Sequence, residues 1–182
     1  MPDNKVTVHI WLPTNMGVLG EIAKFAGVGH AAISLRHNDT DHYITWMAHG
    51  SPFGGFEIDA FRHIDSWTKA QDRQNMVQFF NTSPPTHTVR LKTKQQPTDQ
   101  GLDSGLIEQF WQNRLNNRPK YAFLSLNQNC TGCCAEALCA GGLENYVPAP
   151  KNWFIQDAVT LLSWVQEGER RLGKVVKAPK VV

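Results

Sequence analysis

Hydrophobic and polar residues alternate along the early part of the chain with the two-residue period of β-strands. The segment VTVHIWLP (6–13) alternates in this way, and Pro13 predicts its end. The segments HAAISLRH (30–37) and HYITWMAH (42–49) flank the polar stretch NDTD, an arrangement that predicts a β-hairpin. The segment HTVRLKT (87–93) predicts a further strand. These patterns indicate a sheet built from short strands.

The later part of the chain follows the longer period of helices. The segment 102–117 carries apolar residues at helical spacing, namely Leu106, Ile107, Phe110, Trp111 and Leu115. Residues 131–140 favour a helix that a glycine pair ends, and residues 152–172 predict a long amphipathic helix. A hairpin early in the chain and helices late predict the α+β fold class.

Length, composition and charge add few constraints. A chain of 182 residues with 41% hydrophobic and 19% charged residues is typical of one globular domain, which we place at 1–173, followed by a flexible basic tail at 174–182. A net charge of +2 gives no strong attraction to nucleic acid or to anionic membranes, so neither is an expected partner. No stretch has the roughly 20 apolar residues that cross a bilayer. The N-terminal residues lack the pattern of a secretory signal, so we expect synthesis in the cytoplasm without a signal peptide.

The cysteines are concentrated in the stretch NQNCTGCCAEALCAGG, at Cys130, Cys133, Cys134 and Cys139. Four ligands on one short helix cannot surround an ion tetrahedrally, and no second ligand pair completes a site, so we expect no metal and no cofactor. The CxxC spacing at a helix start leaves a thiol–disulfide exchanger as an alternative. Packing as small buried side chains is a further alternative, which we adopt for Cys134 and Cys139.

Cys130 differs from the other three because it stands at the predicted start of the helix. Unpaired backbone N–H groups and the positive end of the helix dipole favour a thiolate there. A thiolate nucleophile works with an imidazole, and His30 is the best candidate because it opens an apolar strand directly after a glycine. The predicted arrangement is a sulfur at the open mouth of a late helix, faced by an imidazole from an early strand.

Four segments carry a resemblance to a known superfamily. GHAAISL, YITWMA, LIEQFW and YAFLSLNQNCTGCCAEALCAGG, in this order, resemble the circularly permuted papain-like enzymes, which include NlpC-type peptidases and lecithin retinol acyltransferase-like enzymes. In that superfamily a histidine opens an early strand and a late helix begins with cysteine preceded by asparagine, as His30 and Asn129–Cys130 do. The closer likeness is to effector-like domains exported by type VI secretion systems, and it spans residues 28–165.

The resemblance implies a permuted papain-like fold, with helices packed on a small antiparallel sheet and the nucleophile at a helix N-terminus. Cys130 and His30 are the expected catalytic pair. A hairpin that turns symmetrically around Asp39–Thr40 would place His49 opposite His30, so His49 is the expected third member. His42 is the alternative, because its distance from His30 along the chain is similar to that of the second histidine in the acyltransferase branch.

Further residues are expected around this pair. The backbone N–H of Cys130, together with an amide from Asn127, Gln128 or Asn129, would stabilise an oxyanion. Aromatic side chains would wall the substrate cleft, and the candidates are Tyr43, Trp46 and Trp153. The chain departs from related domains in reading Thr-Trp-Met-Ala at 45–48 where they often read SWWP, and in carrying two additional cysteines at 133 and 134.

The expected function is therefore that of a cysteine hydrolase that cleaves an amide bond. The resemblance implies a peptidoglycan-targeting antibacterial effector, an endopeptidase or amidase that acts in the periplasm of a target cell. An immunity protein and a carrier of the secretion system are the implied protein partners. An acyltransferase or lipid esterase on the same scaffold, a non-catalytic binding module and the thiol–disulfide exchanger are the alternatives.

Overall fold

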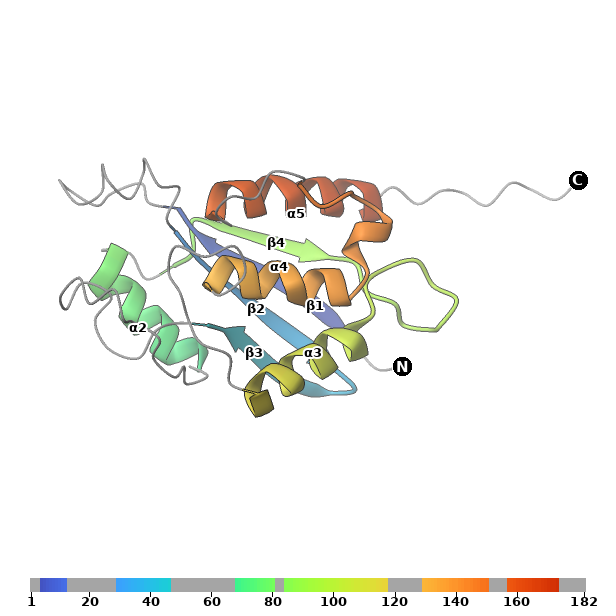
Figure 1. The fold of residues 1–182 in the computed structure, drawn as a ribbon, viewed down its shortest axis with the longest axis horizontal. Coiled ribbons are helices and arrows are strands. Elements are labelled where there is room, and N and C mark those ends of the chain that lie inside the picture. Colours follow the sequence, from blue (N-terminus) through green and yellow to red (C-terminus); the bar gives the residue numbers. More distant parts are fainter. Residues whose placement is uncertain are drawn as a thin grey trace, which may run out of the picture.

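A four-stranded antiparallel sheet forms the centre of the molecule (Figure 1). The computed structural model describes residues 4–12, 29–46, 68–80, 84–117, 129–150 and 157–173. The strands are β1 (Lys5–Trp11), β2 (His30–His37), β3 (Thr40–Thr45) and β4 (His87–Leu91). Their order across the sheet is β3-β2-β1-β4, and every neighbouring pair is antiparallel. The predicted strands at 6–13, 30–37 and 87–93 are thus confirmed in existence, and the α+β class with them.

Three helices cover one face of this sheet (Figure 1). The helices α3 (Ser104–Asn117) and α4 (Cys130–Ala140) pack on β2, while α5 (Ala158–Gly173) packs on β4. A single 3-10 turn, η1 (Leu143–Asn145), follows α4. Gly142 precedes this turn with φ of 86°, a left-handed conformation that favours glycine, so the predicted glycine stop of α4 is confirmed.

The alternation of side chains along the strands separates an apolar face from a polar one. Val8 pairs with Ile33 on one side and with Val89 on the other, and all three are buried against the helices. The opposite face carries the cross-strand neighbours Ser34 and Tyr43. The same alternation places His30 and Thr45 on this polar face, at the end of the sheet away from the β2–β3 turn.

The turn between β2 and β3 corrects the predicted register of the hairpin. Asn38 and Asp39 adopt positive φ angles of 46° and 63°, as a two-residue hairpin turn of the left-handed type requires, and His37 pairs with Thr40. The turn is therefore centred one residue earlier than Asp39–Thr40. The symmetric turn around Asp39–Thr40 on which the prediction of His49 rested is therefore not the turn that forms, and His49 itself lies outside the described residues.

The buried face of α3 also differs from the predicted stripe. Ile107 and Trp111 are buried as expected, but Leu106 is 48% exposed. Arg114 completes the buried face instead, because its guanidinium packs on aromatic rings and pairs with Glu136.

The helix α2 (Lys69–Phe80) was not predicted. Its sequence lacks a marked apolar stripe, but it begins with a capping box. The Thr68 N–H donates to Oε1 of Gln71 over 2.8 Å, and the Gln71 N–H donates to the Thr68 hydroxyl over 3.3 Å. The Thr-x-x-Gln pattern at 68–71 is the sequence signal that marks this helix.

Candidate catalytic site

Asn129 fixes the start of α4 and thereby the position of Cys130. Its backbone is extended, and its Oδ1 accepts hydrogen bonds from the Gly132 N–H over 2.7 Å and from the Thr131 hydroxyl over 2.9 Å. This is the geometry of an N-cap. Cys130 is the first residue of the helix, as predicted, so its own N–H has no acceptor within the helix.

The sulfur of Cys130 lies at the beginning of β2. It contacts the carbonyl oxygen of Gly29 over 3.8 Å, and the backbone N–H groups of Ala31 and Thr131 donate to it. The pairing of β3 with β2 ends at Thr45 and Ala32, so β3 does not cover the backbone of Ala31. The backbone N–H of Ala31 can therefore donate to the sulfur and not to β3.

His30, the first residue of β2, has a partner on one ring nitrogen and faces Cys130 with the rest of its ring. Its Nε2 forms an ion pair with Oδ1 of Asp72 over 2.9 Å, and the Thr45 hydroxyl lies 3.4 Å from the same nitrogen. Its Nδ1 is buried and has no nitrogen or oxygen partner among the described residues, and the Cys130 side chain is the other group that interacts with the ring. The Trp11 ring lies 5.2 Å from the imidazole, centroid to centroid.

Asp72 is the third member of the site, and the sequence interpretation missed it. This carboxylate comes from α2 and is fully buried. Its Oδ2 accepts a hydrogen bond of 2.5 Å from the Tyr43 hydroxyl, while its Oδ1 faces His30. Asp72 therefore contacts the imidazole of His30 on the side away from Cys130, and in this arrangement an acid can orient an imidazole beside a thiol.

The charges of these three groups stabilise one another. Burial opposes ionisation of each group, but the pairing outweighs it. The Asp72 carboxylate and the Cys130 thiolate raise the pKa of His30 to about 10. The His30 imidazolium and the two backbone N–H donors lower the pKa of Cys130, and His30 also lowers the pKa of Asp72. At neutral pH the site thus favours a thiolate, an imidazolium and a carboxylate.

The site is enclosed, which corrects the expected open mouth of the helix. Cys130 is 4% exposed and His30 is 1% exposed. Burial among apolar groups alone would raise the pKa of a thiol, as it does for Cys133, whose pKa rises to about 12. Cys130 behaves in the opposite way because polar groups surround its sulfur.

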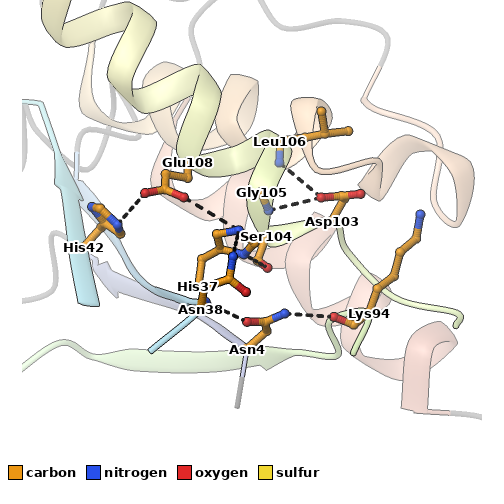
Figure 2. Close-up of polar contacts among 10 residues, drawn as sticks. All are labelled: Asn4, His37, Asn38, His42, Lys94, Asp103, Ser104, Gly105, Leu106 and Glu108. Atoms are coloured by element: carbon orange, nitrogen blue, oxygen red, sulfur yellow. Dashed lines mark hydrogen bonds and ion pairs between the residues drawn. The ribbon is translucent and has the colours of Figure 1, made fainter. Parts of the chain in front are cut away.

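His42 does not belong to this group of residues. It pairs with Leu35 and projects from the face of β3 opposite to Tyr43 and Thr45. Figure 2 shows its ring directed at Glu108 of α3, with an Nε2–Oε1 distance of 2.8 Å. His37 joins the same cluster through the Ser104 hydroxyl, 2.8 Å from its Nδ1. His42 therefore ties the hairpin to α3, and the structure does not bring it to Cys130 and His30 as the alternative prediction required.

The predicted cleft aromatics take other positions. Trp46 is 2% exposed and packs in the core, with Trp111 edge-on and the Arg114 guanidinium 4.6 Å from its ring. It fills the interior and does not wall a cleft. Tyr43 contacts Asp72. Four other predicted site residues lie outside the described residues: Asn127, Gln128, His49 and Trp153.

The remaining cysteines support the packing interpretation. All four cysteines of the chain are described, and all are free thiols. Cys133 and Cys134 belong to the hydrophobic core, and burial raises the pKa of both thiols. Cys139 is half-buried near the end of α4, and burial raises the pKa of its thiol to about 12. The electrostatic environment of Cys130 is therefore unlike that of the other three.

Two kinds of feature are absent from the described residues. None of their histidines, cysteines and acids gather in threes as a metal site requires. Likewise, none of their helices combines the length and the apolar character needed to cross a membrane.

The three side chains define a site of the cysteine–histidine–carboxylate class. Comparison with protein families then places the chain. It belongs to the family of the IcsB middle domain, whose model matches residues 59–180 and so includes Asp72 and Cys130. Comparisons with curated proteins and with solved structures found no match.

Proposed function

We propose that this chain is a cysteine hydrolase with a permuted papain-like fold, in which Cys130, His30 and Asp72 form the catalytic triad. The observation that carries the proposal is the ion pair of His30 with the buried Asp72 carboxylate, beside Cys130 at the start of α4, whose pKa the imidazolium lowers. The preferred reaction is cleavage of an amide bond through an acyl-enzyme.

In the first half of the reaction, the Cys130 thiolate attacks the carbonyl carbon of the substrate. The electrons of the carbonyl bond move onto its oxygen, and the N–H of Cys130 at the start of α4 donates to that oxygen. The amide of Asn129, whose Oδ1 is already bound in the cap, remains the expected second donor. The carbon–nitrogen bond then breaks, the leaving amine takes a proton from His30, and a thioester remains on Cys130.

In the second half, water attacks the thioester. His30, now neutral, takes a proton from the water, and the carbon–sulfur bond breaks. The acid product leaves, and the thiolate–imidazolium pair re-forms. Throughout both halves Asp72 keeps the imidazole oriented and stabilises its charged form, as the third member of such triads does.

The family supports a setting for this activity. IcsB is a secreted Shigella effector, and an exported effector is the role that we propose for this chain. The resemblance to effector-like domains of the permuted papain-like superfamily favours the stem peptides of peptidoglycan as substrate and the periplasm of a target cell as the place of action. A secretion carrier and an immunity protein are the partners that such a role would require.

The test is hydrolysis by the purified chain, with products resolved by mass. Peptidoglycan and mixed phospholipids are incubated separately with the wild-type protein, the Cys130→Ala variant and the Cys139→Ala variant. Cys139→Ala removes a thiol from the same helix without touching the triad, so it controls for the substitution itself. We expect new amine ends in peptidoglycan with wild type and Cys139→Ala, and none with Cys130→Ala.

The other outcomes identify other functions. Release of fatty acid from phospholipid would replace the amidase by a lipid esterase on the same triad. If the protein reduces disulfides and both Cys130→Ala and Cys133→Ala abolish this activity, the chain is a thiol–disulfide exchanger. The full burial of Cys133 disfavours this outcome. Turnover that Cys130→Ala leaves unchanged would overturn the proposal.

A further inference from the structure

Tyr43 lies on the polar face of the sheet, and its hydroxyl is directed at the third member of the triad. This hydroxyl donates to Oδ2 of Asp72, and Nε2 of His30 pairs with Oδ1 of the same carboxylate. Each carboxylate oxygen therefore has its own partner. The two partners come from neighbouring strands, β3 and β2, so the sheet presents them to the carboxylate as a fixed pair.

Asp72 belongs to a helix whose described side chains are mostly exposed. Among the side chains of α2 that the structure describes, Asp72 and Met76 are buried. Six others are exposed: Lys69, Ala70, Gln71, Arg73, Gln74 and Val77. Figure 1 shows α2 apart from the layer that α3, α4 and α5 form on the sheet. Among the described side chains of α2, Asp72 is thus the one whose contacts fix the helix to the polar face of the sheet.

The hydroxyl of Tyr43 acts as a donor at physiological pH. Burial and the neighbouring Asp72 carboxylate raise the pKa of Tyr43 above its usual range, so the phenol stays protonated. Three other titratable groups face it: Arg73 from α2, Cys134 from α4 and the ring of His9, 6.2 Å away between centroids. Arg73 lowers the pKa of Tyr43 without reversing the shift.

We infer that Tyr43 is a positioning residue: its hydroxyl holds the Asp72 carboxylate in the orientation that pairs Oδ1 with His30. The catalytic consequence rests on the proposed function, but the orientation itself has consequences that can be measured without turnover. Tyr43 thus acts on the nucleophile through Asp72 and His30, and it does not wall a substrate cleft.

Removal of the hydroxyl has two opposite effects on the thiol. A carboxylate that loses a donor carries more negative charge toward His30, which would stabilise the ion pair and lower the pKa of Cys130. A carboxylate that also loses its orientation pairs less well with His30, which raises the pKa of Cys130. The direction of the change therefore separates a positioning role from a purely electrostatic one.

The test measures the pKa of Cys130 from the ultraviolet absorbance of its thiolate, taken as the difference from Cys130→Ala in the same background. We expect Tyr43→Phe to raise this pKa by about one unit and to lower kcat/KM about tenfold, as the loss of one hydrogen bond to a charged group predicts. In the Asp72→Asn background, Tyr43→Phe should have no further effect on either quantity. Tyr146→Phe is the matched control, because that hydroxyl bonds to the backbone of Gly101, away from the site.

The outcomes separate the two proposals. If the pKa of Cys130 is low in wild type and Tyr43→Phe leaves it unchanged or lowers it, the positioning role is overturned and the triad stands. An ordinary thiol pKa in the folded wild type would overturn the proposed function. If Tyr43→Phe raises the pKa of Cys130 but no tested substrate is hydrolysed, the positioning role stands and further substrates are tested. Thermal unfolding of each variant confirms that it is folded.

Discussion

The balance between burial and pairing decides the charge of each residue in the site. Cys130 and Cys134 belong to the same helix, and both are buried. Burial raises the pKa of Cys134, whereas pairing with His30 lowers the pKa of Cys130. The difference is the neighbourhood: Cys130 has an imidazolium and two backbone donors. His30 in turn keeps its proton because Asp72 is beside it. One buried carboxylate thus sets the ionisation of a sulfur that it does not touch.

The Asp72→Asn variant tests this dependence. Without the carboxylate, burial lowers the pKa of His30, which is about 10 in the intact site, so the alkaline limb expected in the rate profile should move to lower pH. We expect kcat/KM at neutral pH to fall on the order of 10²- to 10⁴-fold. The measurement is the pH dependence of kcat/KM. The control is Asp103→Asn at the start of α3, where an asparagine also accepts the Gly105 N–H; an equal loss there, or none at Asp72, would contradict the expectation.

At the scale of elements, the site exists because β1, β2 and α5 meet closely beside the start of α4. Gly29 stands at this meeting point, directly before His30. A Cβ atom at this position would lie 2.3 Å from the carbonyl oxygen of Trp11 and 2.6 Å from the Cβ of Ala158. Both distances are shorter than real contacts allow, so only glycine lets the three elements approach in this way.

Gly29→Ala should therefore force these elements apart. We expect the free energy of unfolding to fall by about 1–3 kcal/mol, the usual cost of an overpacked interior. The pKa of Cys130 should rise at the same time, because the N–H of Ala31, which lowers the pKa of Cys130, comes from the strand that Gly29 leads into. Urea unfolding and the thiolate absorbance measure the two effects. Gly173→Ala, at a position with no atoms within 4 Å, is the matched control and should change neither.

Elements with a clear period were predictable, while the geometry between elements was not. The alternation of 30–37 and the cysteine at a helix start follow from local sequence, and both are confirmed. The register of the hairpin depends on which two residues adopt positive φ, and several polar residues in NDTD suit that role. Asp72 was missed because its helix has no apolar stripe, and because its partner His30 is distant in the sequence. Its capping box was the available signal.

At the scale of the whole molecule, the polar face of the sheet and α2 depend on each other through charge. His9 is 7% exposed in the middle of that face, and its Nε2 lies 2.8 Å from the Ser34 hydroxyl. Burial, together with the cations of Lys69 and Arg73 on α2, lowers the pKa of His9 to about 4. The folded protein therefore holds this ring neutral at a pH where the unfolded chain protonates it.

This difference makes the stability of the fold acid-sensitive. The contribution of a neutral His9 is present above the unfolded pKa of 6.5 and is lost as the pH falls toward about 4, since the unfolded state then binds the proton more readily. We expect His9→Gln, which keeps a hydrogen-bonding side chain but does not titrate, to reduce the loss of unfolding free energy across this range by about 1 kcal/mol. Urea unfolding at several pH values measures this loss. Ser34→Ala keeps the ring and its burial, so it should retain the acid-dependent loss; an identical loss in His9→Gln and wild type would show that other groups cause it.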